Sequence, residues 1–201
     1  MQRDDVELLV TRLQELVPAE EPFNGDDMLG SWTLVYSSGE VFRGDPVFAH
    51  IQALAGNPLW PNRVYRMAGA MPTARVGTVQ QTIAAGGEEG RCKRCLVIRL
   101  EVFPWNYLQG TIETEARIVN DDIGDGLEVI VERSAVTESP LTRFWPGKNG
   151  PPAVPVARLS ERFFDRLPRL ALETLYLDSD FRVTRLPDDT LLIYVKDPAQ
   201  T

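Results

Sequence analysis

Residues 175–186, LYLDSDFRVTRL, decide the fold, and the short segment 187–190 (PDDT) links them to the apolar run 191–195, LLIYV. Around Phe181 and Val183 apolar and polar side chains alternate, which is the period of a strand with one face covered by a core. The residues of PDDT suit a tight turn between two strands. The sequence therefore predicts a β-hairpin near the C-terminal end of the chain.

This hairpin is dense in charge, since Asp178, Asp180, Arg182 and Arg185 lie within eight positions. Residues two apart on a strand share a face, so Asp180 and Arg182 can form an ion pair. An arginine that points inward instead needs an acceptor or an aromatic ring beside it. A strand near the other end of the chain has to supply that ring.

Residues 30–38, GSWTLVYSS, form such a strand, and one of its faces carries Trp32, Leu34 and Tyr36. Between the two ends the sequence predicts an antiparallel meander of strands at 76–84, 95–103, 109–119 and 127–136. With a short run at 63–67 this gives about eight strands, enough to close a barrel that holds side chains or one small ligand. The expected fold is a single mainly-β domain whose barrel spans residues 29–196.

Two helices and a loop complete the expected fold. Residues 4–17 carry one apolar stripe and form a helix that packs on the barrel or, alternatively, an amphipathic membrane anchor with an acidic polar face. Residues 140–155 are rich in proline, which excludes regular structure. The helix that follows covers one end of the barrel or serves as a plug, lid or lipid-contacting flap, and its apolar residues are Val156, Leu159, Phe163, Phe164 and Leu167.

The composition is that of an ordinary globular protein, with 43% hydrophobic and 25% charged residues among 201. The net charge of −8 argues against nucleic acid as a partner and against membrane docking through a polybasic patch. Lipid contact is therefore expected to be apolar or directed at weakly charged lipids. No apolar run is long enough for a transmembrane helix, and the first residues do not resemble a targeting peptide.

No group of residues in the sequence indicates catalysis, a metal site or a cofactor. His50 is the single histidine, and Ser37 and Ser38 have no evident base beside them. Asp178 and Asp180 are better explained by an ion-pair network than by an acid–base pair. Cys92 and Cys95 form a CxxC motif, either a redox pair or a chance placement at the start of a strand.

Several segments together resemble the plastid lipid-associated protein (fibrillin) family. Residues 29–38 (LGSWTLVYSS) and 176–185 (YLDSDFRVTR) are similar to the two end motifs of that family. Residues 79–83 (VQQTI) are similar to its middle motif, and 42–48 (FRGDPVF) to a segment of some members. The resemblance covers most of the chain and implies a lipocalin-like β-barrel without catalytic residues.

The resemblance also implies a role. Such a protein would bind, carry or organise apolar lipids such as carotenoids, prenylquinones or fatty acids at plastid globules or thylakoids. Its partners would be the lipid or isoprenoid ligand, a peripheral membrane or globule surface, and an enzyme that it assists. The alternatives are a scaffold with a filled barrel for a lipid-synthesis enzyme, or an enzyme of unrecognised type.

On a lipocalin-like barrel, Gly30-x-Trp32 is similar to the lipocalin Gly-x-Trp signature, whose tryptophan closes one barrel end beneath an arginine from a late strand. We expect Arg185 to stack on Trp32, with Arg182 as the second choice, and Asp178 to belong to the same closure. The inward-facing candidates for ligand binding are Leu34, Tyr36, Gln81, Ile83 and Tyr194. The same side chains could instead fill the interior completely.

Overall fold

The computed structural model describes residues 3–15, 27–39, 75–85, 94–103, 110–120, 126–137, 153–165, 167 and 169–198. These residues form helices α1 (Arg3–Glu15) and α4 (Val156–Phe164) and strands β1 (Gly30–Ser37), β2 (Arg75–Ala85), β3 (Arg94–Phe103), β4 (Gly110–Asn120), β5 (Gly126–Thr137), β6 (Arg169–Leu177), β7 (Phe181–Arg185) and β8 (Leu191–Lys196). The prediction of a mainly-β, barrel-like fold is confirmed. The predicted strand at 63–67 lies outside the described residues.

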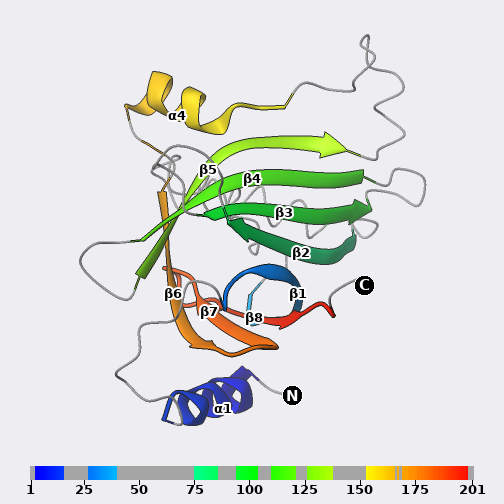
Figure 1. The fold of residues 1–201 in the computed structure, drawn as a ribbon, viewed down its shortest axis with the longest axis vertical. Helices are drawn as coiled ribbons and strands as arrows, with labels where there is room; N and C mark the ends of the chain where they lie inside the picture. Colours follow the sequence, from blue (N-terminus) through cyan, green and yellow to red (C-terminus); the bar gives the residue numbers. More distant parts are fainter. Residues whose placement is uncertain are drawn as a thin grey trace.

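Each described strand pairs antiparallel with the next in sequence, and the sheet curls round until β8 pairs with β1. Figure 1 shows β2 to β5 on one side of this curled sheet and β1 with β6 to β8 on the other. Neighbouring strands in sequence are therefore neighbours in space, as expected for a meander. The first and last strands of the sheet meet at the β1–β8 seam, where the backbone N–H of Asp197 donates to the carbonyl of Ser31 at 2.8 Å.

The C-terminal region contains one more strand than the sequence predicted. Residues 175–186 were expected to form one strand, but β6 ends at Leu177 and β7 begins at Phe181. The turn between them is built by Asp178, whose Oδ1 accepts hydrogen bonds from the backbone N–H groups of Asp180 and Phe181. An aspartate that binds the backbone two and three residues on is a typical turn former. The result is a three-stranded unit in place of a hairpin.

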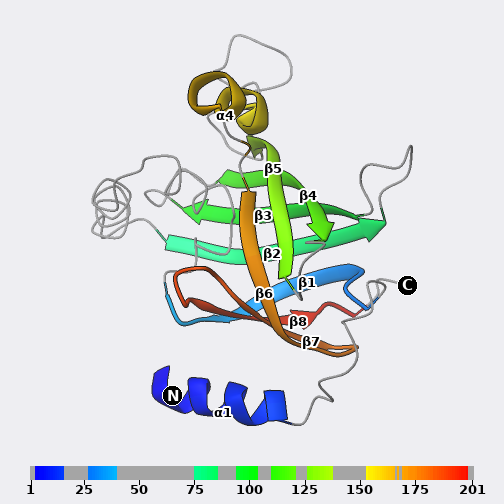
Figure 2. The same ribbon diagram turned by 90° about the vertical axis from the view of Figure 1, so that its left-hand side faces the viewer.

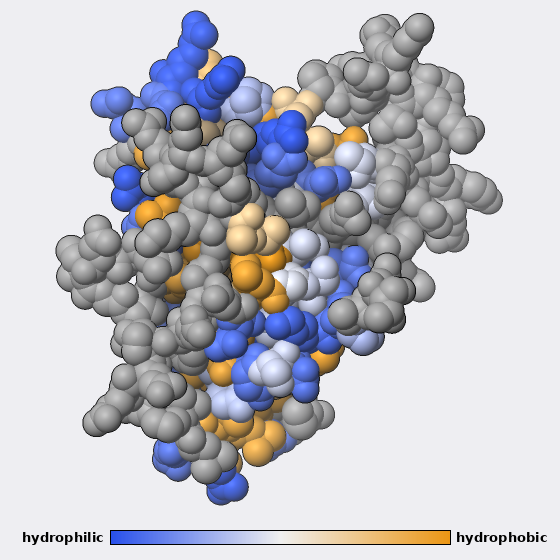
Figure 3. Space-filling model, in the orientation of Figure 1, coloured by the Kyte–Doolittle hydropathy of each residue, from blue (hydrophilic) through white to orange (hydrophobic). Residues whose placement is uncertain are grey.

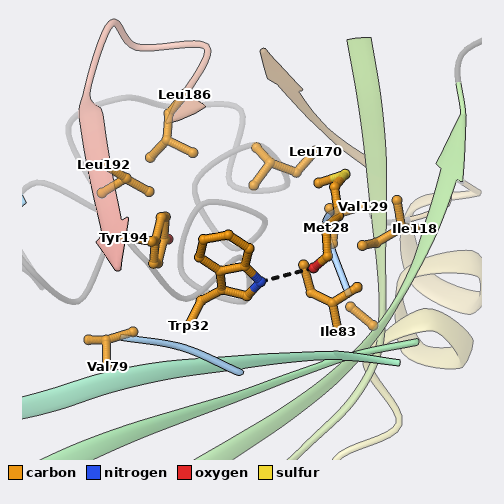
Figure 4. Packing of buried hydrophobic residues seen from close by; sticks show 11 residues of the cluster. Met28, Trp32, Val79, Ile83, Ile118, Val129, Leu170, Leu186, Leu192 and Tyr194 are labelled. Carbon is orange, nitrogen blue, oxygen red and sulfur yellow. Dashed lines mark hydrogen bonds between the residues drawn. The ribbon is translucent and has the colours of Figure 1, made fainter. Parts of the chain in front are cut away.

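The larger core fills the inside of the barrel. Its buried residues come from most of the strands, and they are Met28, Trp32, Val79, Ile83, Ala116, Ile118, Val129, Leu170, Leu186, Leu192 and Tyr194. Trp32 lies in the middle of this cluster, with Tyr194 on one side and Met28 and Ile83 on the other (Figure 4). These side chains alternate along their strands with outward-facing ones, which is the period-two pattern of a barrel.

A second core lies on the outside of the barrel. Helix α1 covers β6, β7 and β8 (Figure 2), and the buried residues between them are Val6, Val10, Leu175, Val183, Leu191 and Ile193. The apolar stripe predicted for residues 4–17 thus packs on the barrel wall, with Leu13 half-buried beside it. Strands β6 to β8 are consequently covered on both faces. Residues 16 and 17 of the predicted helix lie outside the described residues.

Helix α4 contacts β5 at the end of the molecule away from α1 (Figure 2). Just before the helix, Val154 exchanges two backbone hydrogen bonds with Ser134 of β5, at 2.7 and 3.0 Å. The helix ends at Phe164, earlier than the apolar spacing up to Leu167 suggested, because Asp165 adopts a left-handed conformation with φ of 52°. Its backbone N–H then donates to the carbonyl of Glu161, which closes the last turn.

Candidate functional site inside the barrel

Trp32 is fully enclosed, and its position depends on two local features. The indole Nε1–H donates to the carbonyl of Met28 at 2.9 Å (Figure 4), so the polar edge of the ring is satisfied. Gly30 has φ of 128°, and a Cβ at this position would lie 2.8 Å from Cε of Lys196. Glycine is therefore strongly favoured two residues before the tryptophan, because a larger residue would be strained at this positive φ and would also displace the end of the Lys196 side chain.

Arg182 stacks on Trp32 inside the barrel. Its guanidinium carbon lies 5.1 Å from the centre of the Trp32 ring and 4.5 Å from that of Tyr194, so the cation is held by two aromatic faces. The side chain is only 4% exposed. The contact expected between an early tryptophan and a late arginine is therefore present, with the residue that the sequence made the second choice.

The first choice, Arg185, is wrong. Its Nη1 pairs with Glu173 at 3.2 Å on the outer surface of the barrel, where the side chain is partly exposed. Phe181 and Val183 belong to the outer core beneath α1, and Arg185 shares their face of β7. Arg182 and Thr184 consequently point inward. The predicted ion pair between Asp180 and Arg182 is wrong for the same reason, since Asp180 lies exposed in the turn.

Gln81 links the arginine to the second ring. Its Oε1 accepts a hydrogen bond from Nη2 of Arg182, and its Nε2 donates to the hydroxyl of Tyr194 at 2.7 Å. All three side chains are buried. The barrel interior thus holds a polar chain that runs from guanidinium through amide to phenol, beside a largely apolar core and a few buried threonines.

Arg182 has no countercharge among the residues that the structure describes. Burial lowers the pKa of Arg182 to about 10, while the neighbouring Tyr194 acts in the opposite direction. The guanidinium therefore remains cationic at neutral pH. No carboxylate among the described residues lies within ion-pairing distance of it, and its Nε has no hydrogen-bond partner among them. Thr174 of β6 also has a buried hydroxyl without a partner in the described part of the chain.

Asp178 lies outside this site, which corrects the prediction that it belongs to the Trp32 closure. Besides the two backbone bonds of the turn, its Oδ2 accepts the hydroxyl of Tyr176 at 2.8 Å. Burial raises the pKa of Asp178, but the hydrogen bonds from Asp180, Tyr176 and Phe181 outweigh burial, so the net pKa is lower than 3.8. Its role is to hold the turn between β6 and β7.

Replacing Asp178 with alanine should lower the free energy of unfolding by about 1–2 kcal/mol at neutral pH, because three hydrogen bonds to a carboxylate are lost. A lowered pKa stabilises the fold above the ordinary value of 3.8, and this stabilisation is lost as the pH falls through the lower folded value. Urea denaturation at about pH 7 and about pH 3 should therefore show a difference that shrinks in acid. Asp180→Ala, in the same turn, is the control; an equal loss there would contradict the assigned role.

Four of the five predicted ligand-binding residues lie on the inner side of the sheet, namely Leu34, Gln81, Ile83 and Tyr194. Tyr36 does not. The β1–β8 pairing shifts register between Leu34 and Tyr36, and this bulge turns Tyr36 to the outer core beneath α1. Around Trp32 the interior is filled, since Trp32, Val79, Ile83, Val129 and Val131 are at most 2% exposed.

Sequence reasoning missed the buried, inward-facing Thr174 and Thr184, which lie opposite each other where β6 pairs with β7. The alternation along β7 could have identified Thr184, because Thr184 shares a face with Arg182; the sequence prediction assigned that face to the outside.

Of the CxxC pair, Cys95 lies opposite Ala84 of β2 and Arg117 of β4 in the sheet, whereas Cys92 lies outside the described residues, as does His50. The described residues contain no group of His, Cys, Asp and Glu arranged to hold a metal ion.

None of the helices in the described ranges is both long and apolar enough to cross a bilayer. Comparison of the chain with protein-family models, curated proteins and solved structures finds no match.

Proposed function

We propose that this protein is a lipocalin-like, non-enzymatic lipid-associated protein that binds, carries or organises apolar lipids such as carotenoids, prenylquinones or fatty acids. The resemblance to fibrillins motivates the lipid class and the expected location at plastid globules or thylakoids. The observation that carries the proposal is a pair of buried polar atoms, Nε of Arg182 and Oγ1 of Thr174, that lack a partner among the described residues of an apolar barrel interior.

Such atoms are costly, since a buried donor without an acceptor loses about 1–3 kcal/mol relative to a satisfied one. A carbonyl or carboxylate oxygen of a lipid would satisfy Nε of Arg182, and a cationic donor strengthens that bond. The apolar part of the lipid would contact residues such as Leu34 and Leu172, which pack against the interior core but are only half-buried. Binding sites of this type combine an apolar lining with a few polar groups that fix the ligand's orientation.

Identification of lipids that copurify with the protein from its native source would test the proposal directly. In vitro, a long-chain fatty acid should bind more tightly than the corresponding hydrocarbon. Arg182→Met should reduce fatty-acid affinity by about tenfold, the value of one charge-assisted hydrogen bond, and should abolish the discrimination. Arg185→Met on the outer face is the matched control. Equal affinities of both variants, or no lipid in the native extract, would count against an interior site.

A scaffold for a lipid-synthesis enzyme is the second candidate, and two observations favour it. The interior around Trp32 is filled by side chains, and apolar residues at the α4 end are exposed. A filled barrel with an exposed apolar surface suits protein–protein contact better than transport. Copurification of one enzyme in stoichiometric amount, without lipid, would favour the scaffold over the carrier.

A further inference from the structure

Arg182 is the one charged side chain among the buried residues that the structure describes. Its neighbours are neutral, namely the rings of Trp32 and Tyr194 and the amide of Gln81. Aromatic faces and an amide oxygen attract the cation, but they leave its charge uncancelled. Because the burial of an unpaired ion is costly, the described interior favours the addition of one negative charge.

The open hydrogen-bonding position of Arg182 also favours an anion. A guanidinium can only donate; its Nη2 already donates to Gln81, whereas Nε has no partner among the described residues. The buried hydroxyl of Thr174 is open in the same sense, and Thr174 lies opposite Thr184, which shares the inner face of β7 with Arg182. A carboxylate offers acceptors for both groups, and a hydrogen bond between two ions is stronger than one to a neutral oxygen.

Neutral head groups meet only one of these two requirements. The oxygen of a ketone, an ester or an alcohol accepts a hydrogen bond from Nε of Arg182 but leaves the cation without a counterion. A hydrocarbon carotenoid supplies neither an acceptor nor a charge. The described interior therefore distinguishes acids from the other lipid classes named above.

Apolar side chains on the inner face provide contacts for the rest of such a ligand. Ile112 packs against the interior core and is only half-buried. Val136 lies opposite Ile112 where β4 pairs with β5, so it shares that face, and it is 44% exposed. The inner face is thus accessible from solvent at this end of β5, in contrast to its fully enclosed part at Trp32. On the face drawn in Figure 3, apolar side chains likewise reach the surface between hydrophilic ones.

We propose that the barrel interior selects lipids with a single carboxylate, the long-chain acids, whose carboxylate pairs with Arg182 and whose chain contacts the inner apolar side chains. This inference rests on the proposed lipid-binding function and narrows it to one class. Hydrocarbon carotenoids and prenylquinones are not the preferred ligands, because neither carries a negative charge. Gln81 is the residue that sets the preference, since a carboxylate at its position would supply the missing charge from the chain itself.

Isothermal titration calorimetry with three ligands of the same chain length tests the selection on the full wild-type chain. At about pH 8, where carboxylates are ionised, oleic acid should bind at least about tenfold more tightly than methyl oleate or oleyl alcohol, the value of one charge-assisted hydrogen bond. Equal affinities for the three ligands would overturn the acid selection and leave lipid binding itself intact. Binding of none of them would overturn the acid selection and the carrier function together.

Gln81→Glu tests the role of the missing charge. Glutamate has nearly the shape of glutamine and still accepts from Arg182, but it brings a countercharge. The variant should therefore bind oleic acid about tenfold more weakly than the wild type does and methyl oleate with nearly unchanged affinity. Gln80→Glu is the matched control, because Gln80 is the neighbouring residue of β2 and is exposed on the outer face.

The control adds the same charge outside the barrel and should bind oleic acid as the wild type does. Equal losses in the Gln80 and Gln81 variants, or unchanged oleic acid binding by Gln81→Glu, would overturn the selection by Arg182. Melting temperatures close to that of the wild type should show that both variants fold. Should Gln81→Glu fail to fold, the comparison of the three ligands on the wild type decides the question.

Discussion

Replacement of Trp32 by alanine is expected to lower the free energy of unfolding by about 3–5 kcal/mol, the usual range for removing a buried aromatic side chain. The indole is 0% exposed and lies in the middle of the interior core, and the residues around it come from most of the barrel. The substitution removes the aromatic face beneath Arg182 and the hydrogen bond to Met28 as well. Urea denaturation followed by circular dichroism measures the loss.

Val35 is the matched control for this experiment, because it lies on the same strand and is 57% exposed. Val35→Ala should change the free energy of unfolding by no more than about 0.5 kcal/mol, as surface substitutions usually do. A loss below about 1 kcal/mol for Trp32→Ala would show that the indole is not at the centre of a packed core.

The stacking of Arg182 on Trp32 should appear as a coupling energy of about 1–2 kcal/mol in a double-mutant cycle. Trp32→Leu and Arg182→Met suit the cycle, because both replacements keep much of the side-chain volume. The coupling should fall short of the largest cation–π values, because Tyr194 still contacts the guanidinium after Trp32 is changed. The pKa of Arg182, at about 10, keeps the side chain charged at neutral pH, where the cycle is measured.

Arg185 provides the control cycle. It lies on the opposite face of β7 and pairs with Glu173, so Arg185→Met and Trp32→Leu should have additive effects. Additivity in the Arg182 cycle together with coupling in the Arg185 cycle would reverse the assignment of the two arginines.

The sequence predicted strand orientation correctly where only one face of the strand is covered, because apolar and polar residues then alternate between core and solvent. Residues 109–119 form β4 nearly as predicted, because Ile112, Ala116 and Ile118 face the core. The orientation of β7 was not predictable in this way. Arg182, Val183 and Thr184 are all buried, since the interior lies on one side of β7 and α1 on the other. When both faces of a strand are covered, its apolar residues no longer indicate which face is inside.

The candidate site was therefore predicted only in part. The pairing of an early tryptophan with a late arginine came from the resemblance to the Gly-x-Trp signature, whereas the choice between Arg182 and Arg185 depended on the orientation of β7. Tyr36 was predicted to face inward, but a bulge between Leu34 and Tyr36 turns it outward. The sequence of β1 does not indicate this bulge, because no glycine lies inside the strand. The exposure of Phe163 was also beyond the sequence, because helical spacing shows that a face is apolar but not what covers it.

The seam between β1 and β8 makes closure of the sheet depend on β8, which is synthesised after the other strands of the sheet. Until Leu191–Lys196 have left the ribosome, β1 and β7 are both unpaired edges, and such edges recruit strands from other chains. A nascent or C-terminally truncated chain is thus an aggregation hazard even though most of its strands are complete.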